Sequence, residues 1–326
     1  MPEAFIAPTA IGLRSRSGMR ADFNANGSLR RFEYDPVSLN LFVGNEMEGG
    51  PTNLYLRCHG ETIEWTPLLG PRSGTRFAAG AGGVLLGVGT WRGIDYSIAL
   101  VLADSAPIWF WHVRLENRTS RPLKVDLSYA QDLALAPYGA VRLNEYYVSQ
   151  YLDHTPLRHA THGIVVASRQ NLAVDQKNPW CLIGSLREAG SFATDALQFH
   201  GLASRRGDTP DGLVNELPGR RLQHEHAMVV LRDAPIRLHP HGSVAAGFFG
   251  AFHADHPDVT SDADLAVVSR VLALPEALPA TIGAASRLAL ALTVTMPGCW
   301  SMILVTLTPG PRSTSFTVRL AGKASP

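Results

Sequence analysis

The chain has 326 residues, 45% of them hydrophobic and 17% charged, and its 29 basic and 28 acidic residues leave a net charge of +1. This length and apolar content suit a buried core and exclude a disordered protein. The near-neutral balance argues against a dedicated nucleic-acid binder, which needs a basic stripe. Three widely spaced cysteines without a CxxC pair exclude a disulfide scaffold or zinc ribbon. The first residues lack a basic stretch followed by an apolar run, so we expect no signal peptide and a cytoplasmic location.

The first local signal is a turn. Asn26-Gly27 lies between Phe23 and the segment 29–32, and Asn-Gly tolerates the positive φ of a tight hairpin. Further along, apolar residues alternate at period two over 94–102, 109–115 and 123–129. Successive side chains of a strand face opposite ways, so these runs predict strands with one apolar and one solvent-facing side. The residues predicted to face solvent are Arg114, Glu116, Lys124, Asp126 and Ser128.

Strands are also predicted for the segments 84–88, 164–167, 182–186, 227–231 and 244–252. The best helix signal begins at Ser261, which can cap a helix with Asp264 three residues on, and Leu265, Val268 and Leu272 follow as an apolar stripe. Many strands at short spacing with turns between them predict an all-β fold, a large antiparallel two-sheet super-sandwich with one or two short helices.

Three sequence motifs are weak evidence for a nucleotide, metal or catalytic site. The glycine-rich run 80–89 has Leu85 where a dinucleotide fingerprint needs its third glycine, so a loop entering a strand is favoured. His154, His159 and His162 have no usual metal-ligand spacing, and we expect no metal site. The carboxylates of Glu46 and Glu48 are predicted to lie on a solvated loop.

The densest polar and aromatic segment is 144–154. Sugars are held by such sets, because aromatic faces cover their C–H surfaces while amides and carboxylates bond their hydroxyls. The alternative is that buried tyrosines use their hydroxyls to join two sheets. The candidate substrate-binding residues are Asn144, Glu145, Tyr147, Gln150 and Asp153, and Asn171, Asn178 and Trp180 form a second set. No catalytic residue is assigned.

The composition changes near the C-terminus. After Glu276 the sequence has no Asp or Glu, whereas it has four basic residues. The segment 288–307 is uncharged and long enough to span a bilayer, but Pro297-Gly298 interrupts it, so we do not expect a membrane span.

Several long motifs resemble one family. They are similar to the N-terminal region of glycoside hydrolase family 94, formerly glycosyltransferase family 36, and most to β-1,2-oligoglucan phosphorylases and the phosphorylase-like part of cyclic β-1,2-glucan synthases. The resemblance covers roughly residues 12 to 276. Its motifs lie in the segments 26–57, 129–154, 168–180, 193–202 and 248–265.

The resemblance implies a large β-sandwich that precedes a linker and an (α/α)6 barrel. In that family the barrel carries an Asp general acid and the phosphate site. Inorganic phosphate, a co-substrate, attacks the anomeric carbon with inversion and releases glucose 1-phosphate from a β-glucan. No cofactor or metal is implied. The family's enzymes are usually dimers, so a homodimer is a possible state here.

The resemblance ends near residue 276, and the remaining 50 residues are too few for a barrel of about a dozen helices. We therefore expect a sandwich over 1–260, the start of a linker helix over 261–276, and an atypical tail over 277–326 that is foreign or frameshifted. The expected function is the non-catalytic sandwich domain of a truncated inverting β-glucan phosphorylase, with weak or absent glucan binding. The alternatives are a stand-alone carbohydrate-binding module and a structural partner of a separately encoded barrel.

Overall fold

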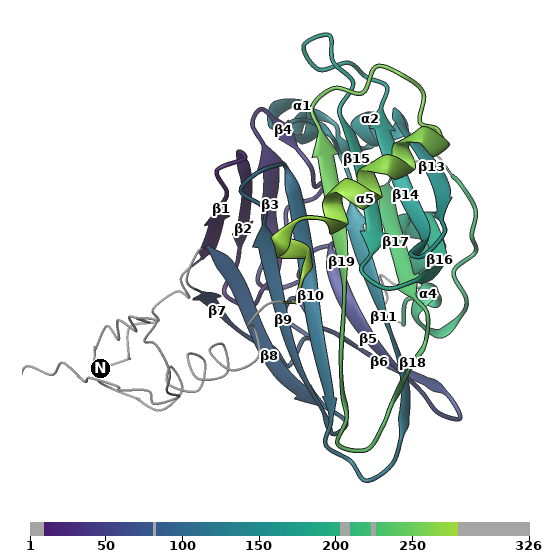
Figure 1. Ribbon diagram of the computed structural model, residues 1–326. Coiled ribbons are helices and arrows are strands. Elements are labelled where there is room, and N and C mark those ends of the chain that lie inside the picture. The colour runs from purple at the N-terminus through teal and green to yellow at the C-terminus, as the bar shows by residue number, and fades with distance from the viewer. Residues whose placement is uncertain (1–9, 81–82, 203–208, 223–225, 280–326) are drawn as a thin grey trace, which may run out of the picture.

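The computed structural model describes residues 10–80, 83–202, 209–222 and 226–279. Within these ranges the strands form two sheets, accompanied by short helices (Figure 1). Neighbouring strands are antiparallel apart from a single parallel pairing of Gly163 with Ala189. The predicted all-β, two-sheet super-sandwich is therefore confirmed.

The smaller sheet is built from the N-terminal hairpin. The predicted turn at Asn26-Gly27 lies between two of its strands, and Gly27 has a φ of 77°. A Cβ at Gly27 would also lie 2.2 Å from the ring of Phe77, so glycine is needed here for both reasons. The strand order is β1 (Ile11–Arg14), β2 (Met19–Phe23), β3 (Leu29–Tyr34), β4 (Val37–Ser38) and β12 (Ala136–Pro137).

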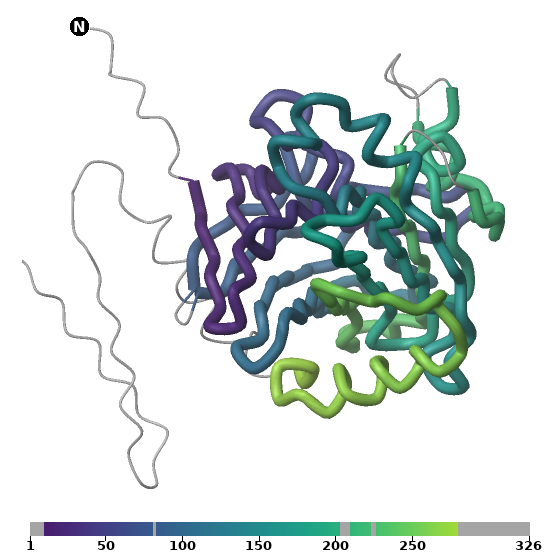
Figure 2. Tube along the Cα trace, turned by 90° about the horizontal axis from the view of Figure 1, so that it is seen from above, coloured from purple at the N-terminus to yellow at the C-terminus, as the bar shows by residue number. Residues whose placement is uncertain are grey.

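The larger sheet curls, as the view from above shows (Figure 2). All the strands predicted from alternation and from apolar runs belong to it. Its order is β6 (Ile63–Pro67), β5 (Asn53–His59), β11 (Leu123–Asp132), β17 (Ala227–Asp233), β16 (Ala189–Asp195), β14 (Gly163–Gln170), β15 (Trp180–Ser185), β19 (Ser243–His253), β10 (Ile108–Asn117), β9 (Ile94–Leu102), β8 (Val84–Trp91) and β7 (Arg76–Gly80), while β13 (Leu152–His159) pairs with β14 and β18 (Ile236–Leu238) with β11.

Aromatic side chains join the two sheets. Phe32 of the smaller sheet meets Trp109 of β10 edge-on, with ring centroids 4.9 Å apart, and Phe23 meets Trp111 in the same way at 6.0 Å. Across the ladder from Trp109 lies Gly250 of β19, where a Cβ would come within 2.0 Å of the indole. The core between the sheets is therefore packed around these indole rings.

The prediction that Asp126 and Ser128 face solvent is wrong. Both side chains are buried. Asp126 lies against Arg57, His59 and Arg232, and α3 (Ala196–His200) and α4 (Asp211–Val214) form a second hydrophobic cluster with Ala130 of the same strand. Arg232 joins the layers, since its guanidinium donates to the hydroxyl of Ser128 and to the backbone oxygen of Asn215. Alternation along one strand does not reveal that a distant segment covers its polar side. Arg114 and Lys124 are exposed as predicted, and Glu116 is half-buried.

The other covering element is the capped helix. Ser261 and Asp264 form the predicted capping box, a 3₁₀ turn follows over Asp262–Leu265, and α5 spans Ala266–Leu272. Three valines of α5, at positions 267, 268 and 271, pack against apolar side chains of β10, β15 and β19, and α5 crosses the face of the larger sheet (Figure 1). A 3₁₀ turn at Pro275–Ala277 lies near the end of the described residues.

The described helices include none that is both long and apolar enough to cross a membrane. The uncharged segment 288–307 and nearly all of the atypical tail lie outside the described residues.

Candidate functional site

The candidate sugar-binding segment folds into two short helices that sequence reasoning missed. They are α1 (Tyr138–Leu143) and α2 (Glu145–Gln150), and Asn144 lies between them. The side-chain oxygen of Asn144 accepts a hydrogen bond from the backbone nitrogen of Tyr147 at 3.0 Å, which caps α2. An asparagine followed by a glutamate is a helix-start signal that could have identified α2.

Apolar contacts fix both helices to the body of the domain. Val141 of α1 and Val148 of α2 are buried in a cluster with Leu41, Ala134 and Ala136. The opposite side of α2 carries aromatic rings that reach solvent, since 43% of Tyr146 and 48% of Tyr147 is exposed. The alternative that these tyrosines are core residues joining two sheets therefore does not hold for Tyr146 and Tyr147.

Neighbouring rings hold both tyrosines in place. The hydroxyl of Tyr151 donates to that of Tyr147 at 3.1 Å, and the two rings meet edge-on with centroids 5.0 Å apart. Tyr146 packs edge-on against Phe42 with centroids 6.0 Å apart. Residues four apart on a helix share a side, so Tyr146 and Gln150 lie on one strip of α2.

The remaining predicted residues have different surroundings. Glu145 lies half-buried in the first turn of α2, and Gln150 is exposed at its last residue. Asp153 lies beyond the helix on β13, where its carboxylate forms an ion pair with Arg221. The structure thus brings Asn144, Glu145, Tyr147 and Gln150 together on one helix, with Asp153 beside them in sequence and engaged by an arginine.

In the second predicted set, Asn171 is exposed and accepts a hydrogen bond from Arg169, whereas Asn178 and Trp180 make contacts inside the domain. The indole of Trp180 is fully buried, stacks on His256 with centroids 4.9 Å apart, and donates to the hydroxyl of Thr260 at 3.0 Å. The side-chain amide of Asn178 donates to the backbone oxygen of Gln170. Trp180 therefore offers no ring face to a ligand.

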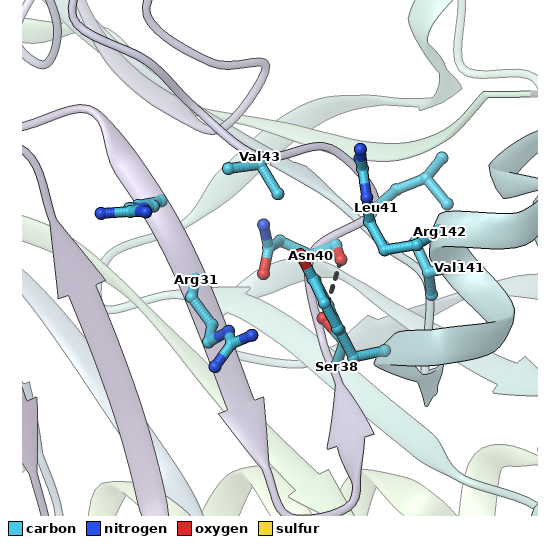
Figure 3. Close-up of a pocket in the computed structure, with 9 residues that line it drawn as sticks. Arg31, Ser38, Asn40, Leu41, Val43, Val141 and Arg142 are labelled. Atoms are coloured by element: carbon cyan, nitrogen blue, oxygen red, sulfur yellow. Dashed lines mark hydrogen bonds between the residues drawn. The ribbon is translucent and has the colours of Figure 1, made fainter.

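A shallow surface hollow that encloses only about 10 Å³ adjoins α1 (Figure 3). Figure 3 shows Arg31 and Arg142 on opposite sides of it, with Ser38 and Asn40 between them. The guanidinium carbon of Arg31 lies 4.6 Å from the ring centroid of Tyr138. We call this feature the arginine hollow, and its lining residues are Arg30, Arg31, Ser38, Asn40, Leu41, Val43, Tyr138, Val141 and Arg142.

Buried hydrogen bonds fix the floor of the arginine hollow. The side chain of Asn40 accepts from the backbone nitrogen of Phe32 at 2.8 Å and donates to the backbone oxygen of Phe42 at 2.7 Å. The carboxylate of Asp132 accepts from the backbone nitrogens of Leu41 and Phe42. Burial raises the pKa of Asp132, and these hydrogen bonds act against that rise.

The three clustered histidines have separate surroundings. The ring of His154 is buried and its Nδ1 lies 2.8 Å from the hydroxyl of Ser168, whereas the rings of His159 and His162 contact each other. In the described ranges, no three His, Cys, Asp or Glu side chains are placed to share a metal ion.

The described strands form a two-sheet β-sandwich domain, and the exposed tyrosines of α2 lie on its surface. Residues 22–250 match the family model described as the SOGP N-terminal domain, so the chain belongs to that family. Over 219 residues, which are 67% of this chain, it is 31% identical to a 1,2-beta-oligoglucan phosphorylase of Listeria innocua, and the match covers 19% of that protein. The predicted resemblance to the N-terminal region of a glucan phosphorylase is thereby confirmed. The chain spans about a fifth of the length of this relative.

Solved structures with a similar arrangement include two carbohydrate-active proteins. One is a putative kojibiose phosphorylase from the human microbiome, with a TM-score of 0.44, 9% identity, and coverage of 80% of this chain and 32% of that one. Another is a bacterial glucoamylase in complex with acarbose, with a TM-score of 0.46, 8% identity, and coverage of 81% and 35%.

Proposed function

We propose that this chain is the glucan-contacting, non-catalytic N-terminal domain of a phosphorylase-related protein. Its membership of the SOGP N-terminal domain family supports the placement, and the named substrate of the relative, a 1,2-β-oligoglucan, suggests the linkage. The observation that carries the sugar contact is the exposed face of α2. There two tyrosine rings, Tyr146 and Tyr147, are open to solvent yet held by neighbouring rings.

The chemistry of this face suits a saccharide. Tyrosine rings cover the C–H faces of pyranose units, and the side chains of Glu145 and Gln150 supply hydroxyl partners. Rings already held in place lose little conformational freedom on binding. An open helix face covers less of a ligand than an enclosed pocket does, so we expect a dissociation constant on the order of 1 mM.

Calorimetric titration with β-1,2- and β-1,4-linked gluco-oligosaccharides tests the contact. We expect heat of binding with the β-1,2 series and a loss of at least about fivefold in affinity for Tyr147→Ala, because the exposed ring would be removed. The matched control is Leu197→Ala, which removes a side chain that is equally exposed, at 48%, from α3. Equal affinities in both variants and the original protein would contradict the proposed face.

The isolated chain should not cleave glucan by itself. The family match lies within the N-terminal domain, and the resemblance assigns bond cleavage to a separate barrel. We therefore expect no glucose 1-phosphate above the blank when the purified chain is incubated with β-1,2-oligoglucan and inorganic phosphate. Release at a rate proportional to protein concentration would contradict a non-catalytic role.

A further inference from the structure

The arginine hollow concentrates positive charge in a chain that is nearly neutral overall. Its lining includes three arginines and no carboxylate, whereas the whole chain has a net charge of +1. Arg31 lies 3.3 Å from Glu33, and Glu33 is shared with Arg20. Within the described ranges, Arg30 and Arg142 have no ion pair with a carboxylate. Two cationic charges at this place are therefore uncompensated.

The hollow is also organised before any ligand arrives. Stacking on the ring of Tyr138 restrains the guanidinium of Arg31. Arg142 lies in the last turn of α1, and the buried side chain of Val141 anchors that helix. Between the two arginines, the hydroxyl of Ser38 donates to the backbone oxygen of Asn40 at 3.1 Å (Figure 3). A guanidinium held on an aromatic ring, as that of Arg31 is, loses less entropy on binding than a free one.

We infer that the arginine hollow binds a phosphate dianion, either free or as the phosphate monoester of a small molecule. Guanidinium groups match phosphate oxygens with paired hydrogen bonds. A dianion neutralises both uncompensated charges, of Arg30 and Arg142, whereas a carboxylate or chloride would neutralise one. The inference is independent of glucan binding at α2, because different side chains carry it.

Titration of the purified chain with inorganic phosphate at low ionic strength tests this site. The expected dissociation constant is on the order of 1 mM, and Arg142→Gln should weaken it about tenfold through loss of a charge-assisted contact. Arg30→Gln is a second variant with the same expected direction. Both positions are exposed, so folding should be retained, and a thermal melt checks it. The control is Arg237→Gln on β18, an exposed arginine outside the hollow, which should leave affinity within about twofold.

A parallel titration with glucose 6-phosphate distinguishes the two sources of the dianion. Binding of both compounds supports a site for phosphate monoesters, and binding of inorganic phosphate alone supports a site for the free anion. No binding of either compound overturns the inference, as does equal weakening in Arg142→Gln and Arg237→Gln. Tyr147→Ala should bind phosphate normally. Phosphate binding without glucan binding would refute the proposed function alone, and the reverse would refute this inference alone.

Discussion

Acid should destabilise this domain through one buried imidazole. His154 on β13 is 1% exposed, its Nδ1 lies 2.8 Å from the hydroxyl of Ser168, and its Nε2 has no hydrogen-bond partner among the described residues. Burial lowers the pKa of His154 from 6.5 to about 4, against the opposing charge of Asp153 and with a smaller contribution from Arg221. The folded protein therefore holds this ring neutral where the unfolded chain protonates it.

This difference in the pKa of His154 makes the folded state less stable in acid. Between pH 6.5 and about pH 4 the unfolded chain binds more protons, so the contribution of His154 to stability is full above pH 6.5 and is lost as the pH falls. A difference of this size corresponds to roughly 3 kcal/mol in full, most of it lost by pH 4.5.

The substitution His154→Gln keeps a hydrogen-bonding side chain near Ser168 but removes the group that titrates in this range. Urea unfolding at pH 7 and pH 4.5 gives the free energy of unfolding of both proteins. The original protein should lose roughly 2 kcal/mol more than the variant over this interval. Other groups, including the buried His200 whose pKa is also lowered to about 4, titrate in both proteins and cancel in the comparison. The same loss in both proteins would show that protonation of His154 does not destabilise the domain.

Two further substitutions test the packing and the cap. Gly250→Ala should lower the free energy of unfolding by about 3 kcal/mol, since the added Cβ would lie 2.0 Å from the indole packed against it. Gly190→Ala, where the Cβ meets open space, should be neutral in the same urea titration, and equal effects would count against tight packing. Asp264→Ala removes the carboxylate that accepts from the backbone nitrogen of Ser261 and should cost about 1 kcal/mol. Asp262→Ala in the same turn should cost less, and the reverse order in thermal melts would contradict the capping role.

The sequence predicted the strands well because their signals are local. The alternating segment 94–102 coincides with β9, and the Asn-Gly turn lies where the hairpin of the smaller sheet requires it. The capped helix was likewise visible in Ser261 and Asp264, since a capping box needs residues only three apart. Its first turn, however, is a 3₁₀ turn.

What the sequence did not reveal depends on contacts between distant segments. Asp126 is buried against Arg57, His59 and Arg232, which come from two other strands, and no pattern within β11 carries that information. The arginine hollow combines Arg31 of β3 with Tyr138 and Arg142 of α1, which lie far apart in sequence. The candidate sugar-binding residues were predicted from composition, and four of the five occur together because Asn144 begins a helix there.

Hydrogen exchange measured by mass spectrometry, with and without a β-1,2-linked gluco-oligosaccharide, tests whether glucan binds the exposed tyrosine face of α2. If glucan lies on the exposed tyrosine face, amides of the segment 138–153 should exchange more slowly with glucan present, and Tyr147→Ala should abolish that change. Slower exchange confined to other segments, or unchanged exchange throughout at a glucan concentration well above 1 mM, would contradict the claim.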